Sequence, residues 1–207
     1  MPDDFDVERL YGARTAAELT AEYDRVAGAY DAALIEGHEW RLPEIVAGLA
    51  AWLLPRTARV LDAACGTGLV GAGMKRFGFA DLHGLDLSPG MLAVARHKDV
   101  YRTLTVAALG ASLPYRTGEF DAFTVAGAFT PQHAPPDSLD ELLRVTRPGG
   151  YALFSLRSDS PPPGFAAQIA RLTAAGRWSL LKEGAEFQSL PLGEPRVRNR
   201  LYVYEIR

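Results

Sequence analysis

A glycine-rich stretch and two carboxylates in the first half of the chain could bind a nucleoside. Residues 60–71 read VLDAACGTGLVG, and residues 66–71 match the dinucleotide-binding pattern G-x-G-x-x-G. Asp62 precedes these glycines, and Asp86 follows Gly68 by eighteen positions. A carboxylate at the end of the second strand, where Asp86 is expected, can accept hydrogen bonds from both hydroxyls of an unphosphorylated ribose. These residues predict a ligand that contains a nucleoside.

The charge of Asp62 discriminates between two ligands that carry such a ribose, NAD and S-adenosylmethionine. Asp62 is expected at the end of the first strand, facing the same cleft as the glycines. A carboxylate there repels the doubly anionic pyrophosphate of NAD but can hold the ammonium of S-adenosylmethionine. Loop amides near Gly66 and Gly68 can bind the carboxylate of the methionine portion. The sequence therefore favours S-adenosylmethionine, and Gly71 is interpreted as a small residue that lets a helix pack on the sheet.

An alternation of short apolar runs with helix-like stretches must position these groups. Two helices are expected before the first strand, over residues 15–34 and 39–54. Beyond them the sequence predicts strands at residues 58–64, 82–87, 101–107, 120–127 and 149–157, and helices at residues 69–78, 88–98 and 137–147. After a proline-rich loop follow a helix at residues 164–176 and two strands at residues 177–190 and 200–207, expected to pair antiparallel at one edge. This order predicts an α/β fold, a doubly wound parallel sheet with helices on both faces.

Length and composition predict a single domain with no membrane or nucleic-acid partner. The 207 residues are 48% hydrophobic and 23% charged, which suits one domain with one core over residues 1–207. The net charge of −3 provides no positive field for nucleic acid. No apolar run is long enough to span a membrane, the acidic N-terminus does not resemble a signal peptide, and the single cysteine suits a reducing compartment. We expect a cytoplasmic protein, of undetermined oligomeric state.

The order of several motifs resembles one enzyme family. VLDAACGTG is similar to motif I of the class I S-adenosylmethionine-dependent methyltransferases, whose usual form is V-L-D-x-G-C-G-T-G. The similarity continues through GLDLSPGML, SLPYRTGEFDAF and LLRVTRPGGYALFS and covers about residues 20–158. Within the family, the glycine-rich segment is most similar to the methyltransferase-like group of the Williams–Beuren syndrome region. The resemblance implies a Rossmann-like seven-stranded sheet in the order 3-2-1-4-5-7-6, with strand seven antiparallel, over about residues 56–207, and a helical cap over about residues 1–55.

The resemblance also assigns residues to S-adenosylmethionine. It implies that Asp62 lies at the methionine end, that Gly66 and Gly68 allow a close backbone approach, and that Asp86 binds the ribose. Leu87 and Met91 would pack on the faces of the adenine, where a thioether suits an aromatic ring.

Some positions depart from the family pattern or extend it. Leu109 stands where the family often has an aspartate, so backbone groups around Leu109 and Gly110 would read the adenine. Ala64 replaces the first glycine of the usual loop, and Ala126, at the end of strand four, would lie beside the methionine backbone. Tyr30 matches an aromatic residue of the capping helix, and an aromatic face near a sulfonium contributes about 0.5–2 kcal/mol. Tyr23 matches another, with a position in the core equally compatible.

The reaction implied is an in-line transfer of a methyl group to a small-molecule acceptor. A hydroxyl or a protonated amine needs a base, and His133, in the loop after strand four, is the candidate. An exposed loop histidine is the alternative interpretation of His133. His38, Trp40 and Arg41 could shape the acceptor pocket. The four histidines show no metal-ligand spacing, so no metal is expected.

Two other functions remain open at this point. The missing adenine aspartate and the lack of an obvious base are compatible with a protein that binds S-adenosylmethionine without turnover, as a sensor or partner subunit. An NAD-dependent oxidoreductase is a third interpretation, because the glycine pattern matches its fingerprint. The acceptor itself cannot be derived from the sequence, since this fold accommodates many substrates.

Overall fold

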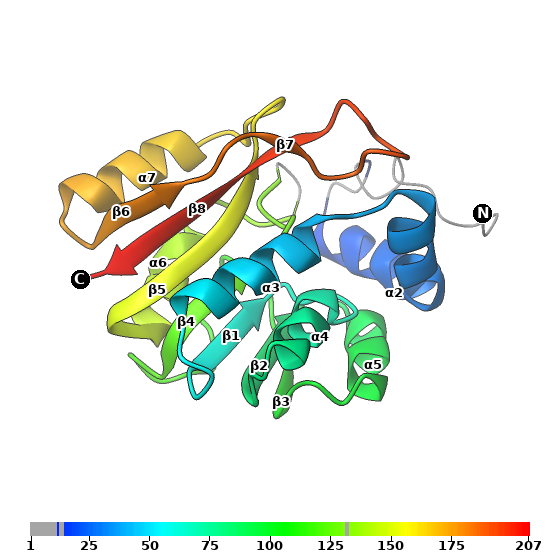
Figure 1. Cartoon of the computed structure of the whole chain (residues 1–207), viewed down its shortest axis with the longest axis horizontal. Coiled ribbons are helices and arrows are strands. Elements are labelled where there is room, and N and C mark those ends of the chain that lie inside the picture. The colour runs from blue at the N-terminus through cyan, green and yellow to red at the C-terminus, as the bar shows by residue number, and fades with distance from the viewer. Residues whose placement is uncertain (1–11, 13–14, 131–132) are drawn as a thin grey trace.

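Eight strands form the central sheet of the described chain, and helices cover both of its faces (Figure 1). The computed structural model describes residue 12 and residues 15–130 and 133–207. The strands are β1 (Arg59–Ala63), β2 (Asp81–Asp86), β3 (Thr103–Val106), β4 (Phe120–Val125), β5 (Thr146–Arg157), β6 (Trp178–Glu183), β7 (Phe187–Gln188) and β8 (Arg198–Ile206). The helices are α2 (Ala16–Ala32), the π-helical turn η1 (Ala33–Gly37), α3 (Leu42–Leu53), α4 (Leu69–Arg76), α5 (Pro89–His97), α6 (Ser138–Val145) and α7 (Phe165–Ala174).

The strand order is β3-β2-β1-β4-β5-β8-β6, with the short β7 paired to β8. Neighbours from β3 to β5 run parallel, whereas β8 is antiparallel to both β5 and β6. This arrangement confirms the predicted Rossmann-like fold, with β8 in the place of the predicted seventh strand. The carboxyl ends of the parallel strands lie at the same end of the sheet, so the loops that follow these strands lie together there. Helix α2 lies beyond this end of the sheet in Figure 1.

One predicted strand is divided in two, which raises the strand number from seven to eight. Residues 177–190 were expected to be continuous, but the register of β6 against β8 shifts between Leu180 and Lys182, and residues 184–186 belong to no strand. The backbone N–H of Gly184 donates to the carbonyl oxygen of Leu201 at 2.8 Å. The bulge turns the chain, and β7 then resumes pairing with β8.

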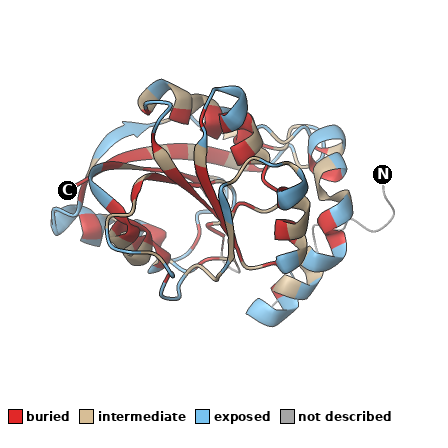
Figure 2. Ribbon diagram, turned by 90° about the horizontal axis from the view of Figure 1, so that it is seen from below, coloured by how far each residue is buried: buried red, intermediate tan, exposed pale blue. Residues whose placement is uncertain are grey.

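Both faces of the sheet are buried, because neighbouring residues of a strand belong to different core clusters. Val60 of β1 packs with α3 and α4, whereas Leu61 packs with α6 and α7. In β4, Ala122 belongs to the same core cluster as Val60, and Phe123 belongs to the same cluster as Leu61. Consecutive side chains of a strand point to opposite faces, so the interior strands are apolar at nearly every position. Figure 2 shows these buried strands between the helices.

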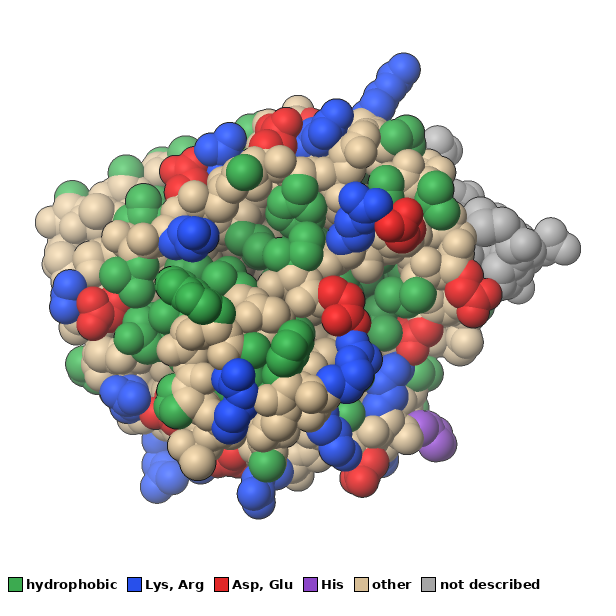
Figure 3. All heavy atoms as spheres, viewed as in Figure 1, with side chains coloured by type: hydrophobic (Ala, Val, Ile, Leu, Met, Phe, Trp, Pro, Cys, Tyr) green, Lys and Arg blue, Asp and Glu red, His purple; other side chains and the backbone are tan. Residues whose placement is uncertain are grey.

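The helices before β1 have two different roles in packing. Val46 and Ala47 of α3 are buried against the sheet and α4, so α3 belongs to the core layer. Val26 and Ala27 of α2 instead pack on Met91 of α5, beyond the carboxyl ends of the parallel strands. None of the helices in the described part of the chain has the length and apolar composition that crossing a bilayer requires. On the face shown in Figure 3, basic and acidic side chains are interspersed.

Candidate functional site

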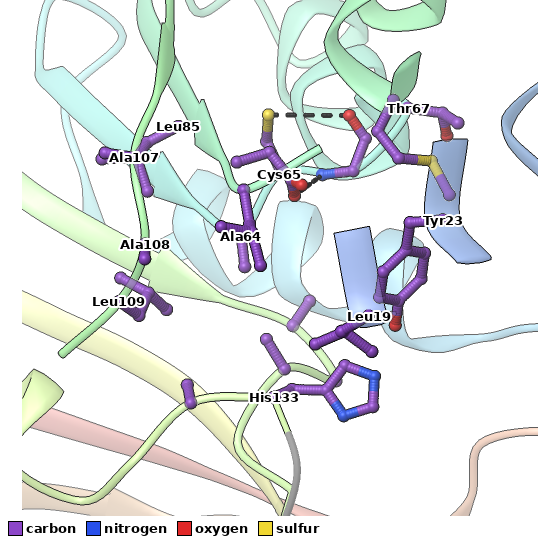
Figure 4. Close-up of a pocket in the computed structure, with 18 of the residues that line it drawn as sticks. Leu19, Tyr23, Ala64, Cys65, Thr67, Leu85, Ala107, Ala108, Leu109 and His133 are labelled. Atoms are coloured by element: carbon purple, nitrogen blue, oxygen red, sulfur yellow. Dashed lines mark hydrogen bonds between the residues drawn. The ribbon is translucent and has the colours of Figure 1, made fainter. Parts of the chain in front are cut away.

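A cavity of about 330 Å³ lies between α2 and the loops that follow β1, β3 and β4. Figure 4 shows Ala107, Ala108 and Leu109 on one side of this cavity and Leu19 and Tyr23 of α2 on the other. The position agrees with the general rule that open α/β sheets bind ligands beyond the carboxyl ends of their strands. We call it the main cavity.

Asp86 lines the main cavity at the end of β2, and two backbone N–H groups fix its carboxylate. Its Oδ2 accepts a hydrogen bond from the N–H of Gly66 at 2.8 Å, and its Oδ1 accepts one from the N–H of Ser88 at 2.9 Å. Burial raises the pKa of Asp86, and these N–H donors act against that rise. A carboxylate oxygen that accepts one hydrogen bond can accept another, so Asp86 can still bind a pair of hydroxyls.

The loop after β1 turns sharply at three residues with left-handed backbone conformations. Ala64, Gly66 and Gly68 have φ angles of 57°, 54° and 89°. Glycine adopts this region freely, whereas an alanine there is strained by about 1–2 kcal/mol. Ala64 and Gly66 line the main cavity, but Gly68 does not; it stands at the N-cap of α4. Ala64, which replaces the first glycine of the usual family loop, is therefore a strained residue in the cavity wall.

Contrary to the expectation from the sequence, Asp62 does not line the cavity. It is 1% exposed, and side-chain hydroxyls occupy both of its oxygens. Tyr101 donates to Oδ2 at 2.6 Å, and Thr124 donates to Oδ1 at 2.9 Å. Burial raises the pKa of Asp62 to about 6. The carboxylate is thus a buried group outside the cavity wall, and its contact with the methionine ammonium stays a prediction.

The ring of Tyr101 lies against three glycines: Gly68, which was predicted to contact the ligand, Gly71, which was interpreted as a packing residue, and Gly84 of β2. A Cβ atom on Gly71 would lie 2.4 Å from the Tyr101 ring, and one on Gly68 would lie 3.0 Å from it. A Cβ on Gly84 of β2 would lie 3.3 Å from the same ring. The third glycine of the G-x-G-x-x-G pattern therefore makes room for the tyrosine that reaches Asp62. Sequence analysis missed Tyr101, because its position just before β3 fits an ordinary strand residue.

Seven predicted cofactor residues besides Asp86 line the main cavity: Tyr30, Ala64, Gly66, Leu87, Met91, Leu109 and Ala126. Gly110 does not, because Pro135 lies against it: a Cβ on Gly110 would be 2.5 Å from the Pro135 ring. Ala107 and Ala108 line the cavity in its place. Of the predicted pair, Leu109 lines the cavity and Gly110 does not, and the part of this segment that lines it is residues 107–109.

Two carboxylates on one face of α2 hold this helix over the cavity. Asp24 accepts hydrogen bonds from the Ser88 hydroxyl at 2.5 Å and from the N–H of Gly90 at 2.7 Å. Asp31 accepts one from the Thr67 hydroxyl at 2.5 Å and pairs with Lys98 at 2.6 Å. The seven-residue spacing, two helical turns, was the sequence signal that could have predicted both contacts.

A second cavity of about 90 Å³ adjoins the first, and aromatic side chains line both. The residues common to the two cavities are Tyr23, Tyr30, Trp40, Gly127 and His133. Tyr30 meets Tyr23 and Trp40 edge to face, with ring centres 6.2 Å and 6.3 Å apart. These shared residues mark the boundary between the cavities, and Tyr23 therefore lies at the site rather than only in the core.

His133 contacts both cavities, and its surroundings keep the ring neutral. Its Nδ1 is hydrogen-bonded to the Thr130 hydroxyl, and its ring meets that of Tyr23 at 5.5 Å. Burial lowers the pKa of His133 to about 4. His133 is therefore a half-buried residue that lines both cavities rather than an exposed loop residue, and the lowered pKa favours the neutral ring.

The other three residues that were proposed to shape an acceptor pocket behave differently from one another. Trp40 lines both cavities. His38 is buried outside them and donates from Nδ1 to the carbonyl oxygen of Ala33 at 2.8 Å. Arg41 pairs with Glu39 on the surface. The described residues contain no cluster of three or more histidine, cysteine, aspartate or glutamate side chains that could hold a metal.

Comparison with known proteins adds an independent line of evidence. Residues 61–154 match the family model described as "Methyltransferase domain". The chain is 36% identical over 183 residues to human Methyltransferase-like protein 27, covering 83% of this chain and 73% of that protein. It is 40% identical over 118 residues to the demethylmenaquinone methyltransferase of Thermus thermophilus, covering 55% of this chain and 53% of the relative.

A solved structure shares the fold at low sequence identity. The TehB-like SAM-dependent methyltransferase from Corynebacterium glutamicum superposes with a TM-score of 0.67 and 19% identity. The match covers 90% of this chain and 99% of that one. At this identity the similarity concerns the fold, and the sequence relatives carry the family assignment.

Proposed function

Because this chain belongs to the class I S-adenosylmethionine-dependent methyltransferases, we propose that it methylates a small molecule bound in the second cavity. The observation that carries this proposal is the pair of adjoining cavities. The main cavity offers groups suited to the cofactor, and the second provides separate room for an acceptor. The aromatic boundary that they share is then the place of methyl transfer.

The residues of the main cavity fit S-adenosylmethionine. Asp86 would bind the two ribose hydroxyls, and Leu87 and Met91 would pack on the adenine. Residues 107–109 would contact the adenine edge through their backbone, and Ala126 would lie beside the methionine portion. The cofactor, when bound, supplies a methyl group already activated by a positively charged sulfur, so alignment and exclusion of water are what remains for the protein to provide.

The boundary residues support a role in alignment and in exclusion of water. Tyr23 and Tyr30 come from α2, which Asp24 and Asp31 fasten to the loops after β1 and β2. Their rings line both cavities, and an aromatic face stabilises a neighbouring sulfonium by about 0.5–2 kcal/mol. We propose that α2 with η1 forms the cap of the site, while α3 belongs to the core layer.

His133 is the proposed proton acceptor, and its environment restricts the acceptors it can serve. With its pKa lowered to about 4, the ring is neutral and ready to accept a proton, but it is a weak base. It suits an acceptor that has already lost most of its proton or that needs only a hydrogen bond. We further infer that the protein acts in the cytoplasm, which its single, buried cysteine supports.

The proposal is tested by binding and turnover measured separately. We expect S-adenosylhomocysteine to bind the purified protein in isothermal calorimetry, and NAD not to bind. Incubation with tritiated S-adenosylmethionine and a small-molecule metabolite extract should label a compound below about 1 kDa. Binding with no label in any extract would support the alternative, a cofactor-binding protein without turnover. Label confined to protein or nucleic acid would contradict a small-molecule acceptor.

A further inference from the structure

The second cavity has two chemically different walls. Part of its lining is aromatic: Tyr23 and Tyr30 of α2, Trp40 just before α3, and Phe129 after β4. Its sheet side is polar, with Ser155 and Arg157 of β5, Asn199 of β8, and Ser189 after β7. A molecule that fills this space meets flat rings on one side and hydrogen-bond donors on the other.

The charge along the two cavities is polarised. Among the described residues that line the second cavity, Arg157 is the one with a formal charge, and among those that line the main cavity it is Asp86. The positive group thus stands at the acceptor end and the negative group at the ribose end. Asp159 balances the charge of Arg157 from outside the cavity, so the preference for an anion comes from the guanidinium N–H donors that line it, which an anionic acceptor can use and a cationic one cannot.

Asp159 fixes the guanidinium of Arg157 without entering the cavity. The Nε and Nη2 of Arg157 donate to the Asp159 carboxylate at 3.2 Å and 2.5 Å. Asp159 also accepts from the N–H of Arg198 at 3.0 Å, and it does not line the cavity. Burial alone would raise the pKa of Asp159, but the hydrogen bonds from Arg157 and Arg198 hold it below its usual value. A guanidinium held in this way loses little freedom when it binds an anion.

Two serine hydroxyls next to Arg157 complete an anion-binding wall. Ser155 lies two residues before Arg157, so both side chains project from the same face of β5. Its Oγ accepts the N–H of Gly127 at 2.9 Å, and the Oγ of Ser189 accepts from the Asn199 amide at 2.7 Å. A hydroxyl that accepts a hydrogen bond keeps its own hydrogen to donate. Ser155 is 1% exposed, so this donor is held away from bulk water.

We propose that the methyl acceptor is a small aromatic acid. Its carboxylate binds Arg157 with the hydroxyls of Ser155 and Ser189, and its ring packs on Tyr30 and Trp40. The inference rests on the proposed function, in which the second cavity holds the acceptor. It adds a substrate class that the fold and the family leave open.

The test uses three probes with one skeleton and three charges. S-adenosylhomocysteine is first titrated into the native protein, which examines cofactor binding alone. The loaded protein is then titrated with 4-hydroxybenzoate, 4-hydroxybenzyl alcohol and 4-hydroxybenzylamine. We expect the acid to bind about tenfold tighter than the alcohol or more, and the amine to bind most weakly. An amine that binds as tightly as the acid, or failure of all three to bind the loaded protein, would overturn the substrate class while leaving cofactor binding intact.

Variants locate the preference. Arg157→Met should abolish the difference between acid and alcohol and leave S-adenosylhomocysteine affinity unchanged. Arg200→Met is the matched control, because Arg200 lies on β8, pairs with Glu183 and lines neither cavity. Ser155→Ala should reduce the preference for the acid about threefold to tenfold through the loss of one donor. A preference for the acid that persists in both Arg157→Met and Ser155→Ala would place the anion elsewhere and contradict the proposal.

Discussion

Two carboxylates lie at or next to the ends of neighbouring parallel strands, yet they have opposite relations to the cavity. Asp62 of β1 is 1% exposed and bonded to the side chains of Tyr101 and Thr124, whereas Asp86 of β2 is 8% exposed and bonded to backbone N–H groups. Backbone N–H donors from the loops hold the Asp86 carboxylate at the rim of the main cavity, where a ligand can also hydrogen-bond to it. Side-chain donors from neighbouring strands and loops enclose the Asp62 carboxylate. In the proposed function Asp86 binds the ribose and Asp62 supports the fold, and the two differ in their hydrogen-bond partners more than in their place along a strand.

The direction of each side chain explains the difference. Asp62 shares a sheet face with Val60, two residues earlier, and that face is covered by α3 and α4. Tyr101 enters the same layer and reaches Asp62 between Gly68 and Gly71. Asp86 is the last residue of β2, so its side chain emerges where the covering layer ends.

The largest expected effect is on folding. Asp62→Ala leaves the hydroxyls of Tyr101 and Thr124 buried without their acceptor, so the free energy of unfolding should fall by about 2–5 kcal/mol. Chemical denaturation measures it. Glu44→Ala, which removes a largely exposed acid paired with Arg76, is the control and should cost less than about 1 kcal/mol. Equal losses in the two variants would mean that Asp62 is not the structural group described here.

The titration of Asp62 should make the free energy of unfolding depend on pH. Its folded pKa of about 6 lies above the ordinary 3.8, so folding binds a proton between these values and stability falls as pH rises through them. The full difference is about 3 kcal/mol. His133, with its pKa lowered to about 4, acts in the opposite direction in both native protein and variant. Subtracting the unfolding curve of Asp62→Asn from that of the native protein between pH 4 and 7 isolates the Asp62 contribution, and a flat difference would refute it.

Cofactor affinity should rank the two acids in the opposite order from folding stability: loss of Asp86 should weaken binding more than loss of the Asp62 charge. Asp86→Ala removes hydrogen bonds from the ribose hydroxyls to a charged acceptor, so affinity for S-adenosylhomocysteine should fall about tenfold or more. Asp62→Asn should leave that affinity within about threefold of the native value, since it lies outside the cavity wall. Calorimetry on both variants decides the matter: an equal loss in the two would make Asp62 a binding acid after all.

The smallest expected effect concerns Ala64, beside the two acids. At a φ of 57° its side chain is strained by about 1–2 kcal/mol, and the greater freedom of an unfolded glycine offsets about 0.4–1 kcal/mol of the relief. Ala64→Gly should therefore stabilise the protein by up to about 1.5 kcal/mol. Ala63→Gly, one residue earlier within buried β1, should destabilise it instead. Destabilisation by Ala64→Gly would show that its methyl group packs favourably enough to outweigh the strain.

The sequence predicted S-adenosylmethionine correctly, but one premise of that prediction was wrong. Repulsion of NAD by Asp62 required the carboxylate to face the cleft, and Asp62 is enclosed instead. The ordered motifs identified the cofactor independently, and the family comparison confirmed it. Gly71 was correctly interpreted as a small residue, although what it accommodates is the Tyr101 ring.

Local pattern was sufficient where the physics is local. Alternating apolar runs and helices determined the doubly wound sheet, and the spacing from the glycines placed Asp86 at the end of β2, where it lines the cavity, because each depends on neighbours in the chain. Tertiary structure alone decided that Tyr101 encloses Asp62, that Asp24 and Asp31 fasten α2, and that Arg157 meets Tyr30 and Trp40 across one small cavity. These contacts join residues far apart in sequence, and their formation depends on which way each side chain projects after the layers have packed.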